Sequence, residues 1–255
     1  MKKALLASGA VLVLLVLTLA ALFLPIFTGN KAPSDGETLV GGATAVLDGY
    51  VLAFMLPTGE GTLALIDCGN DDEGIALMRA LKAKKIEPTA VKAIFLTHGH
   101  PDHIAGCHLF PKAEVYAFPG DVKIASGEER AKGPLPSKLD LPKHKAIKVT
   151  RTLTDGETVT VGTLTVKAYA VPGHTSGSGV YLANSVLFMG DVVNGRSDGK
   201  TLKNAPWLFS DDTAQSQASV AKLYQRLKAE NADVKTLAPA HSGTIPGLDA
   251  LLTAS

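Results

Sequence analysis

The amino-acid sequence predicts an α/β fold built from two β-rich halves with helices on the outside. Segments with two-residue apolar alternation, or with unbroken apolar residues, occur in two groups separated by a polar, lysine-rich stretch. Each group is accompanied by one longer segment whose apolar residues have helical spacing. Two strand groups with a helix each favour packed sheets with outer helices. At 255 residues the chain can bury one sizeable core or two small ones.

The elements of the first half follow one another with short connections. We expect strands over residues 43–56, 61–69, 91–97 and 113–118. The sequence PTGEG supplies the turn between the first two strands. Apolar spacing predicts a helix over residues 74–86, which ends before Pro88 because proline disfavours helical backbone at the residue ahead of it. A polar loop rich in lysine then runs to about residue 142.

The second half repeats this scheme with a longer helix. We expect strands over residues 158–162, 164–173, 179–184, 185–191 and 234–243. The longest helix candidate after the N-terminal segment covers residues 213–232. The sequence contains no internal repeat of fixed short period, which leaves the arrangement in two halves.

The N-terminal segment is apolar enough for a membrane anchor. Lys2 and Lys3 precede an essentially apolar run over residues 4–27. As a helix this run would span about 36 Å, against about 30 Å for the hydrocarbon core of a bilayer. Residues 18–20 offer a signal cleavage site, but the apolar run continues past them, so we favour an uncleaved anchor over a cleaved signal. The two lysines keep the N-terminus cytoplasmic and send the rest outside.

These observations divide the chain into three parts. Residues 1–28 form a membrane anchor or signal segment, residues 29–42 a linker, and residues 43–255 the folded domain. We expect export, with the domain anchored outside the cytoplasm, or secreted or periplasmic after cleavage. Lys and Arg number 25 against 24 Asp and Glu, so no nucleic-acid partner is expected. The oligomeric state is left open.

The chain has only two cysteines, Cys68 and Cys107. One bridge would not make a disulfide framework. We favour two small buried residues, and we leave open whether they pair.

The stretch THGHPDHIAG, residues 97–106, holds His98, His100, Asp102 and His103 directly after an apolar run. It contains three of the seven histidines in the chain. Imidazole nitrogen and carboxylate oxygen suit Zn²⁺ and neighbouring divalent metals. Four ligands are too many for one catalytic metal, which needs an open coordination position. The cluster therefore favours two metals that share a bridging water and draw further ligands from elsewhere.

Further ligand candidates follow the ends of other expected strands. His174 lies in VPGHTSGS, Asp191 in FMGD and His241 in APAHSG. Loops at one edge of a packed sheet can converge in space. We therefore expect these side chains to line one cleft with the first cluster.

Three other polar residues have weaker settings. Asp67 ends the apolar segment LALIDCG and either supports the site or caps the following turn. His144 lies in the lysine-rich loop and His108 lies beside Cys107. Both histidines are assigned no role in the site.

Taken together, the motifs resemble those of a known family. HGHPDH resembles the HxHxDH motif of the metallo-β-lactamase-fold hydrolases, and LIDCG resembles that superfamily's apolar strand ending in Asp and Gly. VPGHTSGSGVYL, LFMGD and LAPAHSG resemble its remaining metal motifs, in the family's order. The resemblance covers about residues 43–245. It implies an αββα sandwich of two mixed β-sheets flanked by helices, preceded in this chain by the N-terminal hydrophobic helix.

The resemblance also implies a role for each candidate. It assigns the first metal to His98, His100 and His174. It assigns the second metal to Asp102, His103 and His241, with Asp191 bridging both. Asp67 would fix the orientation of one ligand. The cofactors would be two divalent ions, with Zn²⁺ as the first candidate and Mn²⁺ or Fe²⁺ as alternatives.

A hydrolytic mechanism follows from this arrangement. Two divalent cations would lower the pKa of a bridging water, and the resulting hydroxide would attack a small-molecule ester, thioester, lactone or phosphodiester. Asp102 or Asp191 would accept or relay the proton. The only histidine near Ser176 and Ser178 in the sequence is His174, which is already a proposed metal ligand. This argues against a serine hydrolase.

The family's own diversity leaves alternatives open. Members with a bridging Asp include thioesterases of the glyoxalase II type, lactonases and phosphodiesterases. Dedicated metallo-β-lactamases usually carry Cys or Ser in that region, so Asp191 counts against β-lactam hydrolysis, although export would suit it. Glyoxalase II and nuclease members carry additional domains, and only a short tail follows His241, so neither identity is expected.

Two alternatives are not hydrolases. A dinuclear-iron redox protein is one, but such relatives usually replace a histidine of the first motif with a carboxylate, and this chain keeps all three. An inert binding module is the other, and the full set of ligand residues argues against it.

Substrate selectivity is expected in residues 194–214, which follow Asp191. This segment contains the only tryptophan, Trp207, close to Phe209. Such an apolar tip beside a metal cleft suits an acyl chain or a ring. The alternative is that Trp207 merely anchors the loop to the core.

Overall fold

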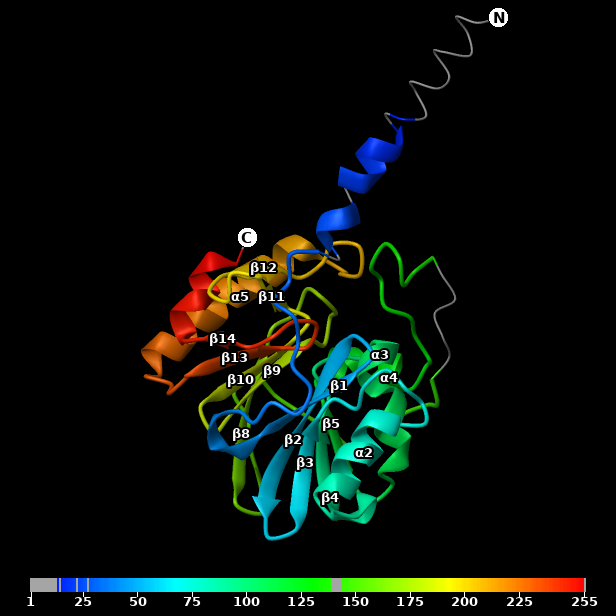
Figure 1. Ribbon diagram of the computed structural model, residues 1–255, viewed down its shortest axis with the longest axis vertical. Helices are drawn as coiled ribbons and strands as arrows, with labels where there is room; N and C mark the ends of the chain where they lie inside the picture. The colour runs from blue at the N-terminus through cyan, green and yellow to red at the C-terminus, as the bar shows by residue number, and fades with distance from the viewer. Residues whose placement is uncertain (1–12, 14, 22, 27, 139–143, 255) are drawn as a thin grey trace, which may run out of the picture.

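Two six-stranded sheets pack against each other, and helices cover their outer faces in the computed structural model (Figure 1). The structure describes residues 13, 15–21, 23–26, 28–138 and 144–254. Each sheet contains both parallel and antiparallel pairs. The predicted sandwich of two mixed sheets flanked by helices is therefore confirmed.

The first sheet is formed by the first half of the chain and has the strand order β1-β2-β3-β4-β5-β6. Its strands are β1 (Thr44–Asp48), β2 (Val51–Gly59), β3 (Thr62–Ile66), β4 (Val91–Phe95), β5 (Glu114–Ala117) and β6 (Arg151–Thr152). The first three pair antiparallel, and β3 to β6 pair parallel. Parallel neighbours bring the carboxyl ends of β3 and β4 to the same edge of the sheet.

The second sheet is formed by the second half and has the order β14-β13-β10-β9-β8-β7. Its strands are β7 (Thr158–Val161), β8 (Leu164–Ala170), β9 (Gly179–Ala183), β10 (Val186–Gly190), β13 (Thr236–Pro239) and β14 (Ile245–Pro246). A separate ribbon joins β11 (Val193–Gly195) to β12 (Leu202–Asn204). Since β10 and β13 are parallel, the loops that follow them leave the sheet at one edge.

Two longer helices lie where the apolar spacing predicts them. They are α2 (Ile75–Ala83) and α5 (Thr213–Ala229). The side chain of Asp212 caps α5 by accepting a hydrogen bond from the backbone N–H of Gln215 at 2.8 Å. The remaining helical elements are the short α3 (Pro101–Ile104) and α4 (Val122–Ala125), with 3₁₀ turns η1 (Val40–Gly42), η2 (Pro88–Ala90), η3 (Ala105–Leu109), η4 (Pro119–Asp121) and η5 (Leu248–Thr253).

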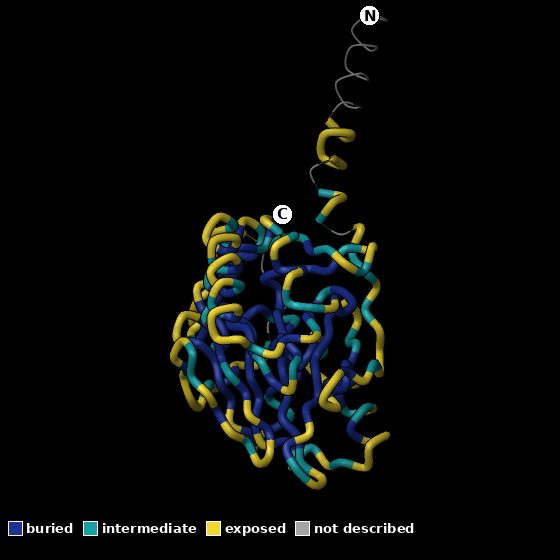
Figure 2. The backbone as a smooth tube through the Cα atoms, turned by 90° about the vertical axis from the view of Figure 1, so that its left-hand side faces the viewer, coloured by how far each residue is buried: buried dark blue, intermediate teal, exposed yellow. Residues whose placement is uncertain are grey.

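Three apolar clusters correspond to the three interfaces of a four-layer sandwich. The first lies between the sheets, the second between the first sheet and α2, and the third between the second sheet and α5. Strand β2 shows the reason, because Phe54 faces the first cluster and Met55 the second. A central strand with both faces buried reads as an unbroken apolar run. Figure 2 shows buried backbone through the strands and exposed backbone along the loops and outer helices.

One predicted strand was wrong in detail. The segment 43–56 is a hairpin of β1 and β2 that turns at Gly49 and Tyr50, where Gly49 has a φ of +65°. Glycine adopts this left-handed conformation at no steric cost. The break matters for function because the turn lies beside the candidate site.

The predicted anchor or signal segment lies largely outside the described residues. The described residues between 13 and 26 are helical, and Val16 and Leu17 among them are exposed. Among the helices in the described part of the chain, none has the length and apolar character needed to cross a membrane. The membrane association of residues 1–28 therefore stays a prediction.

The structure decides the question that the sequence left open, which is whether the two cysteines pair. Cys68 and Cys107 form a disulfide between the loop after β3 and the 3₁₀ turn η3. Both cysteines are buried, which agrees with the apolar setting read from the sequence. Their separation of 39 residues hid a proximity that the parallel pairing of β3 and β4 creates.

Candidate metal centre

All seven predicted ligands lie in loops that follow the carboxyl ends of four strands. His98 and His100 follow β4, and Asp102 and His103 lie on α3 immediately after them. The other three ligands follow strands of the second sheet: His174 follows β8, Asp191 follows β10 and His241 follows β13. The structure brings these side chains together, as the positions at strand ends predicted.

Three histidines form the more deeply buried group. His98 Nε2 lies 3.0 Å from His100 Nδ1, and His174 Nε2 lies 3.2 Å and 3.1 Å from these two atoms. All three side chains are buried. Three ring nitrogens that converge on one point are an arrangement that could hold a metal ion.

The second group contains Asp102, His103 and His241. Asp102 Oδ2 lies 3.3 Å from His241 Nε2 and 3.8 Å from His103 Nε2. These three residues also form a set that could hold a metal ion. His103 is buried, whereas the side chains of Asp102 and His241 are about one-fifth exposed, at 21% and 19%.

Asp191 lies between the two groups. One carboxylate oxygen, Oδ1, lies 3.2 Å from His103 Nε2. The other, Oδ2, lies 3.1 Å from His241 Nε2 and 3.6 Å from His174 Nε2. Asp191 therefore approaches both the three-histidine group and the second group, as a bridging ligand must.

Asp67 supports the site from behind. Its Oδ2 lies 2.8 Å from His103 Nδ1 and accepts a hydrogen bond from the Thr97 hydroxyl at 2.6 Å. Its Oδ1 accepts the backbone N–H of Thr97 at 2.7 Å. Asp67 also has a φ of +57°, a strained conformation for a residue with a side chain. These contacts turn His103 Nε2 toward the other ligands, so the predicted orienting role fits the geometry better than a turn cap.

Other histidines of the site are oriented through their second ring nitrogen. His98 Nδ1 lies 3.1 Å from the Thr97 hydroxyl, and His174 Nδ1 lies 3.1 Å from the Ser210 hydroxyl. His241 Nδ1 donates to the backbone carbonyl of Tyr50 at 3.1 Å. Metal-binding histidines are generally held in this way.

The two groups differ in charge in the metal-free protein. Burial lowers the pKa of His98 and His100, and it lowers the pKa of His174 to about 3, so all three rings are neutral near pH 7. Burial also disfavours the charged form of His241, but Asp191 and Asp102 outweigh it and raise the pKa to about 10. The pKa of His103 is likewise raised, because the charges of Asp191, Asp102 and Asp67 outweigh the effect of burial.

The unpaired atoms fit divalent metal ions. Among the described residues, the buried atoms without a hydrogen-bond partner include two that face the site, His103 Nε2 and Asp191 Oδ1. Buried polar atoms are normally paired, because an unpaired one costs about 1–3 kcal/mol. Nitrogen and carboxylate oxygen donors without protein partners match the ligand preferences of Zn²⁺, Mn²⁺ and Fe²⁺. The residues present therefore fit the cofactor class expected from the sequence.

Comparison with known proteins identifies the family. The family model described as the metallo-beta-lactamase superfamily matches residues 47–241, most of the chain. The chain belongs to this superfamily. Its curated relatives include enzymes named as hydrolases, and the solved structures similar to it include metallo-β-lactamases.

Among curated superfamily members, the hydroxyacylglutathione hydrolase of Citrobacter koseri is 29% identical over 179 residues, which cover 70% of this chain and 58% of the relative. The Salmonella typhi enzyme of that name is 29% identical over 162 residues, covering 64% of this chain and 54% of the relative. The match thus spans little more than half the length of these relatives.

Solved structures of the superfamily share the fold. The metallo-β-lactamase SMB-1 in complex with mercaptoacetic acid aligns with a TM-score of 0.62 and 24% identity, covering 83% of this chain and 81% of that one. The B3 metallo-β-lactamase BLEG-1 aligns with a TM-score of 0.61 and 25% identity, covering 82% and 95%.

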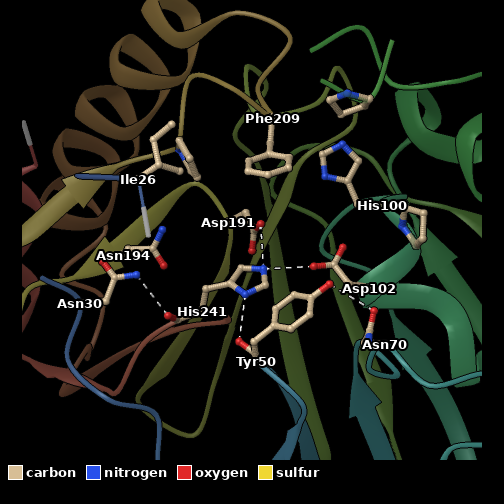
Figure 3. A pocket seen from close by; sticks show the side chains of 13 residues that line it. Ile26, Asn30, Tyr50, Asn70, His100, Asp102, Asp191, Asn194, Phe209 and His241 are labelled. Atoms are coloured by element: carbon tan, nitrogen blue, oxygen red, sulfur yellow. Dashed lines mark hydrogen bonds and ion pairs between the residues drawn. The ribbon is translucent and has the colours of Figure 1, made fainter. Parts of the chain in front are cut away.

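A cavity of about 450 Å³ opens over the ligands and includes residues that the sequence did not single out. Tyr50, Asn70 and Asn194 line it. The Tyr50 ring stacks on His241 with centroids 5.6 Å apart, and its hydroxyl lies 3.2 Å from Asn70 Oδ1 (Figure 3). The Asp48-Gly49 dipeptide is a strong hairpin signal that could have exposed this turn and its tyrosine.

Asp121 is the second residue that was missed. It is buried, and its carboxylate accepts the backbone N–H of Gly99 at 2.6 Å, the Thr175 hydroxyl at 2.8 Å and the backbone N–H of Gly177 at 2.7 Å. It therefore ties the loop of His98 and His100 to the loop of His174. Asp121 lies beyond the carboxyl end of β5, in FPGD, so the strand-end rule that found Asp191 could have found it.

The two residues proposed for substrate contact are placed differently. Phe209 lines the cavity. Trp207 is not among the residues that line it, and its ring lies 5.8 Å from the ring of Phe23. The assignment therefore fits Phe209 more directly than Trp207.

The two histidines that were assigned no role lie away from the site. His108 Nδ1 lies 2.9 Å from the carbonyl of Ala105, and His144 Nδ1 lies 2.8 Å from the carbonyl of Lys145. Neither lines the cavity.

Proposed function

We propose that this chain is a dinuclear metal-dependent hydrolase. His98, His100 and His174 hold one divalent ion, and Asp102, His103 and His241 hold the other. The observation that carries this proposal is the position of Asp191, whose two oxygens lie within 3.1–3.6 Å of histidines in both groups. Zn²⁺ is the first candidate, with Mn²⁺ and Fe²⁺ as alternatives.

In this proposal, the carboxylates of Asp102 and Asp191 accept the proton that the attacking water loses. His103 and His241 outweigh the effect of burial and lower the pKa of Asp102 to about 2, and the pKa of Asp191 is lowered in the same way. Both groups are therefore ionised at neutral pH and can accept a proton. When bound, two divalent ions lower the pKa of a coordinated water and polarise the scissile group.

Tyr50 supplies a donor on the open side of the site. Burial, followed by the charges of Asp102 and Asp191, raises its pKa, so its hydroxyl keeps its proton at neutral pH. From the cavity wall it can donate a hydrogen bond to a substrate oxygen. The residue thus orients substrate in this proposal.

The substrates we propose are small molecules with an ester, thioester or lactone bond. Hydroxyacylglutathione hydrolases are among the relatives, which supports hydrolysis as the reaction class. β-Lactam hydrolysis is the second candidate, because BLEG-1 shares 25% identity over 82% of this chain. The carboxylate at position 191 argued against it from the sequence, and a direct assay decides.

We also propose that the domain acts outside the cytoplasm. The Cys68–Cys107 disulfide supports this, because such bonds persist mainly in oxidising compartments. Fractionation of cells that express the full chain tests it: recovery in the cytoplasmic fraction with free thiols would contradict export.

The function is tested on the full chain after metal loading. We expect about two metal equivalents by mass spectrometry, and hydrolysis of an aryl ester, a thioester or a lactone in a panel that includes a phosphodiester and a chromogenic cephalosporin. One metal equivalent or none would refute the dinuclear assignment. Turnover of the cephalosporin alone would favour the second candidate.

A further inference from the structure

Two residues of the segment that covers residues 23–26 and 28–32 belong to the wall of the metal cavity. Ile26 and Asn30 both line the cavity, although they lie far from the metal loops in sequence. Figure 3 shows Ile26 and Phe209 on one side of the cavity, with Asp191 and His241 opposite them. The segment was expected to be an anchor end and a linker, so its place at the site needs a separate explanation.

The segment is fixed to the loop that carries His241. The backbone N–H of Lys31 donates to the carbonyl of Gly195 at 2.9 Å, and the backbone N–H of Gly243 donates to the carbonyl of Lys31 at 2.9 Å. The Lys31 ammonium donates to the carbonyl of Thr244 at 2.7 Å. A Cβ at position 243 would lie 2.6 Å from the carbonyl oxygen of Ala32, so this close approach requires glycine. Residues 30–32 are therefore docked on the site.

The residues just ahead are fixed to β12 and to the loop after it. The Lys203 ammonium donates to the carbonyls of Pro25 at 2.9 Å and Thr28 at 2.8 Å, where the helical turns end. A lysine at this place satisfies carbonyls that lack a helical partner. The Phe23 ring also packs against Trp207, with centroids 5.8 Å apart. These contacts hold Ile26 over the cavity.

Part of the cavity lining is apolar. Besides Ile26, the apolar residues that line the cavity are Pro101, Pro136, Pro206 and Phe209, while Asn30 and Asn194 add polar groups near Ile26. Among the described residues that line the cavity, none is Lys or Arg. A substrate that carries carboxylates or a phosphate away from the scissile bond would find no cationic side chain there. The chemistry of the wall therefore suits an uncharged apolar group.

We propose that residues 23–26 and 28–32 are a substrate-binding strap and that Ile26, with Phe209, binds the unbranched apolar acyl chain of the substrate. This rests on the proposed hydrolase function and names its substrate class: esters, thioesters or lactones of medium-chain fatty acids. The strap is a specificity element. It makes no contact with the reacting bond in this proposal.

Acyl-chain selectivity of the metal-loaded full chain tests the strap. The probes are p-nitrophenyl acetate, butyrate and octanoate. Each methylene buried against the wall should raise kcat/KM about fourfold. In Ile26→Ala the octanoate-to-acetate ratio of kcat/KM should fall at least fourfold. Leu252→Ala is the matched control, because Leu252 lies outside the strap, is 63% exposed and does not line the cavity, and it should leave the ratio unchanged.

A binding measurement separates failure of the strap from failure of the hydrolase assignment. Trp207 is the only tryptophan and lies against Phe23, so its fluorescence reports on the strap. Octanoate should change the emission at concentrations several-fold below those of acetate, and Ile26→Ala should remove that difference. Equal half-saturation in wild type and Ile26→Ala, or an unchanged selectivity ratio, overturns the strap. Absence of hydrolysis across the panel overturns the proposed function while the fluorescence still tests the strap.

Discussion

The two groups of proposed ligands share one sequence motif but lie in different environments. His98 and His100 belong to a buried group of three histidines, whereas Asp102 and His103 belong to a group with two carboxylates nearby and partial exposure. The chain separates them at Pro101, the first residue of α3, since proline suits the first turn of a helix. The difference teaches that a dense motif can serve two sites of unlike affinity.

The largest effect is expected at Asp191, which approaches both groups of ligands. Asp191→Ala should lower turnover about a thousandfold or more, because the carboxylate that approaches histidines of both groups is lost. We expect fewer than two bound metals by mass spectrometry. Asp233→Ala is the control, since Asp233 is exposed and precedes β13 at its amino end. Wild-type turnover in Asp191→Ala would mean that Asp191 is no ligand.

At low pH, metal should be released from the second group before it is released from the three-histidine group. Burial lowers the pKa of all three buried histidines, that of His174 to about 3, so protons compete with metal for them less than for an ordinary histidine. The pKa of His241 is raised to about 10, so metal must displace a proton from it. Affinity at the second group should then fall about tenfold per pH unit for each displaced proton, which is about a hundredfold per proton from pH 7 to pH 5.

Metal titration at both pH values, with proton release followed on a pH-stat, measures this difference. Proton release should accompany the second equivalent and be small for the first. Equal release for both equivalents contradicts the assignment of charge to the two groups.

Two buried carboxylates allow each group to be weakened separately. Asp67→Asn should reduce affinity at the second group about 10–100-fold, because Asp67 orients His103. Asp121→Asn should reduce affinity at the three-histidine group by a similar factor, because Asp121 joins its two loops. Competition with a chromophoric chelator gives both affinities. If either variant weakens both groups equally, the groups do not have independent supports.

The smallest expected effect is at His144. His144→Ala should leave metal content and turnover unchanged within error, because its ring lies at an exposed loop and contacts only the carbonyl of Lys145. Kinetics and mass spectrometry on that variant check it. A large loss would show that the histidines were divided wrongly between site and surface.

The sequence was most informative where ligands follow strand ends. Asp191 and His241 could be placed because apolar runs locate strands, and parallel strands end at one edge. The turn at Tyr50 was missed because the segment 43–56 was read as one strand although Asp48 and Gly49 interrupt its apolar residues. The contacts of Ile26 could not be found, because they depend on chain segments about two hundred residues apart that no local pattern links.

The disulfide was missed for a related reason. The proximity of Cys68 and Cys107 depends on the pairing of β3 with β4 and on the turn after α3. The spacing of the two cysteines in the sequence predicts neither this strand pairing nor this turn. The proposed metal ligands could be predicted from the sequence because several of them lie close together in short motifs. Asp121 could not be predicted in this way, because its role depends on contacts between three loops.

The same disulfide affects the order in which the protein matures. Cys68 follows Asp67, and Cys107 lies four residues beyond His103. A reduced chain would present two thiols behind the second group, and thiolates are strong Zn²⁺ ligands. Oxidation removes these competitors before they can capture the ion. Correct loading with metal is therefore expected to follow formation of the disulfide. A chain that receives zinc while it is reduced is expected to bind the ion through Cys68 and Cys107 instead.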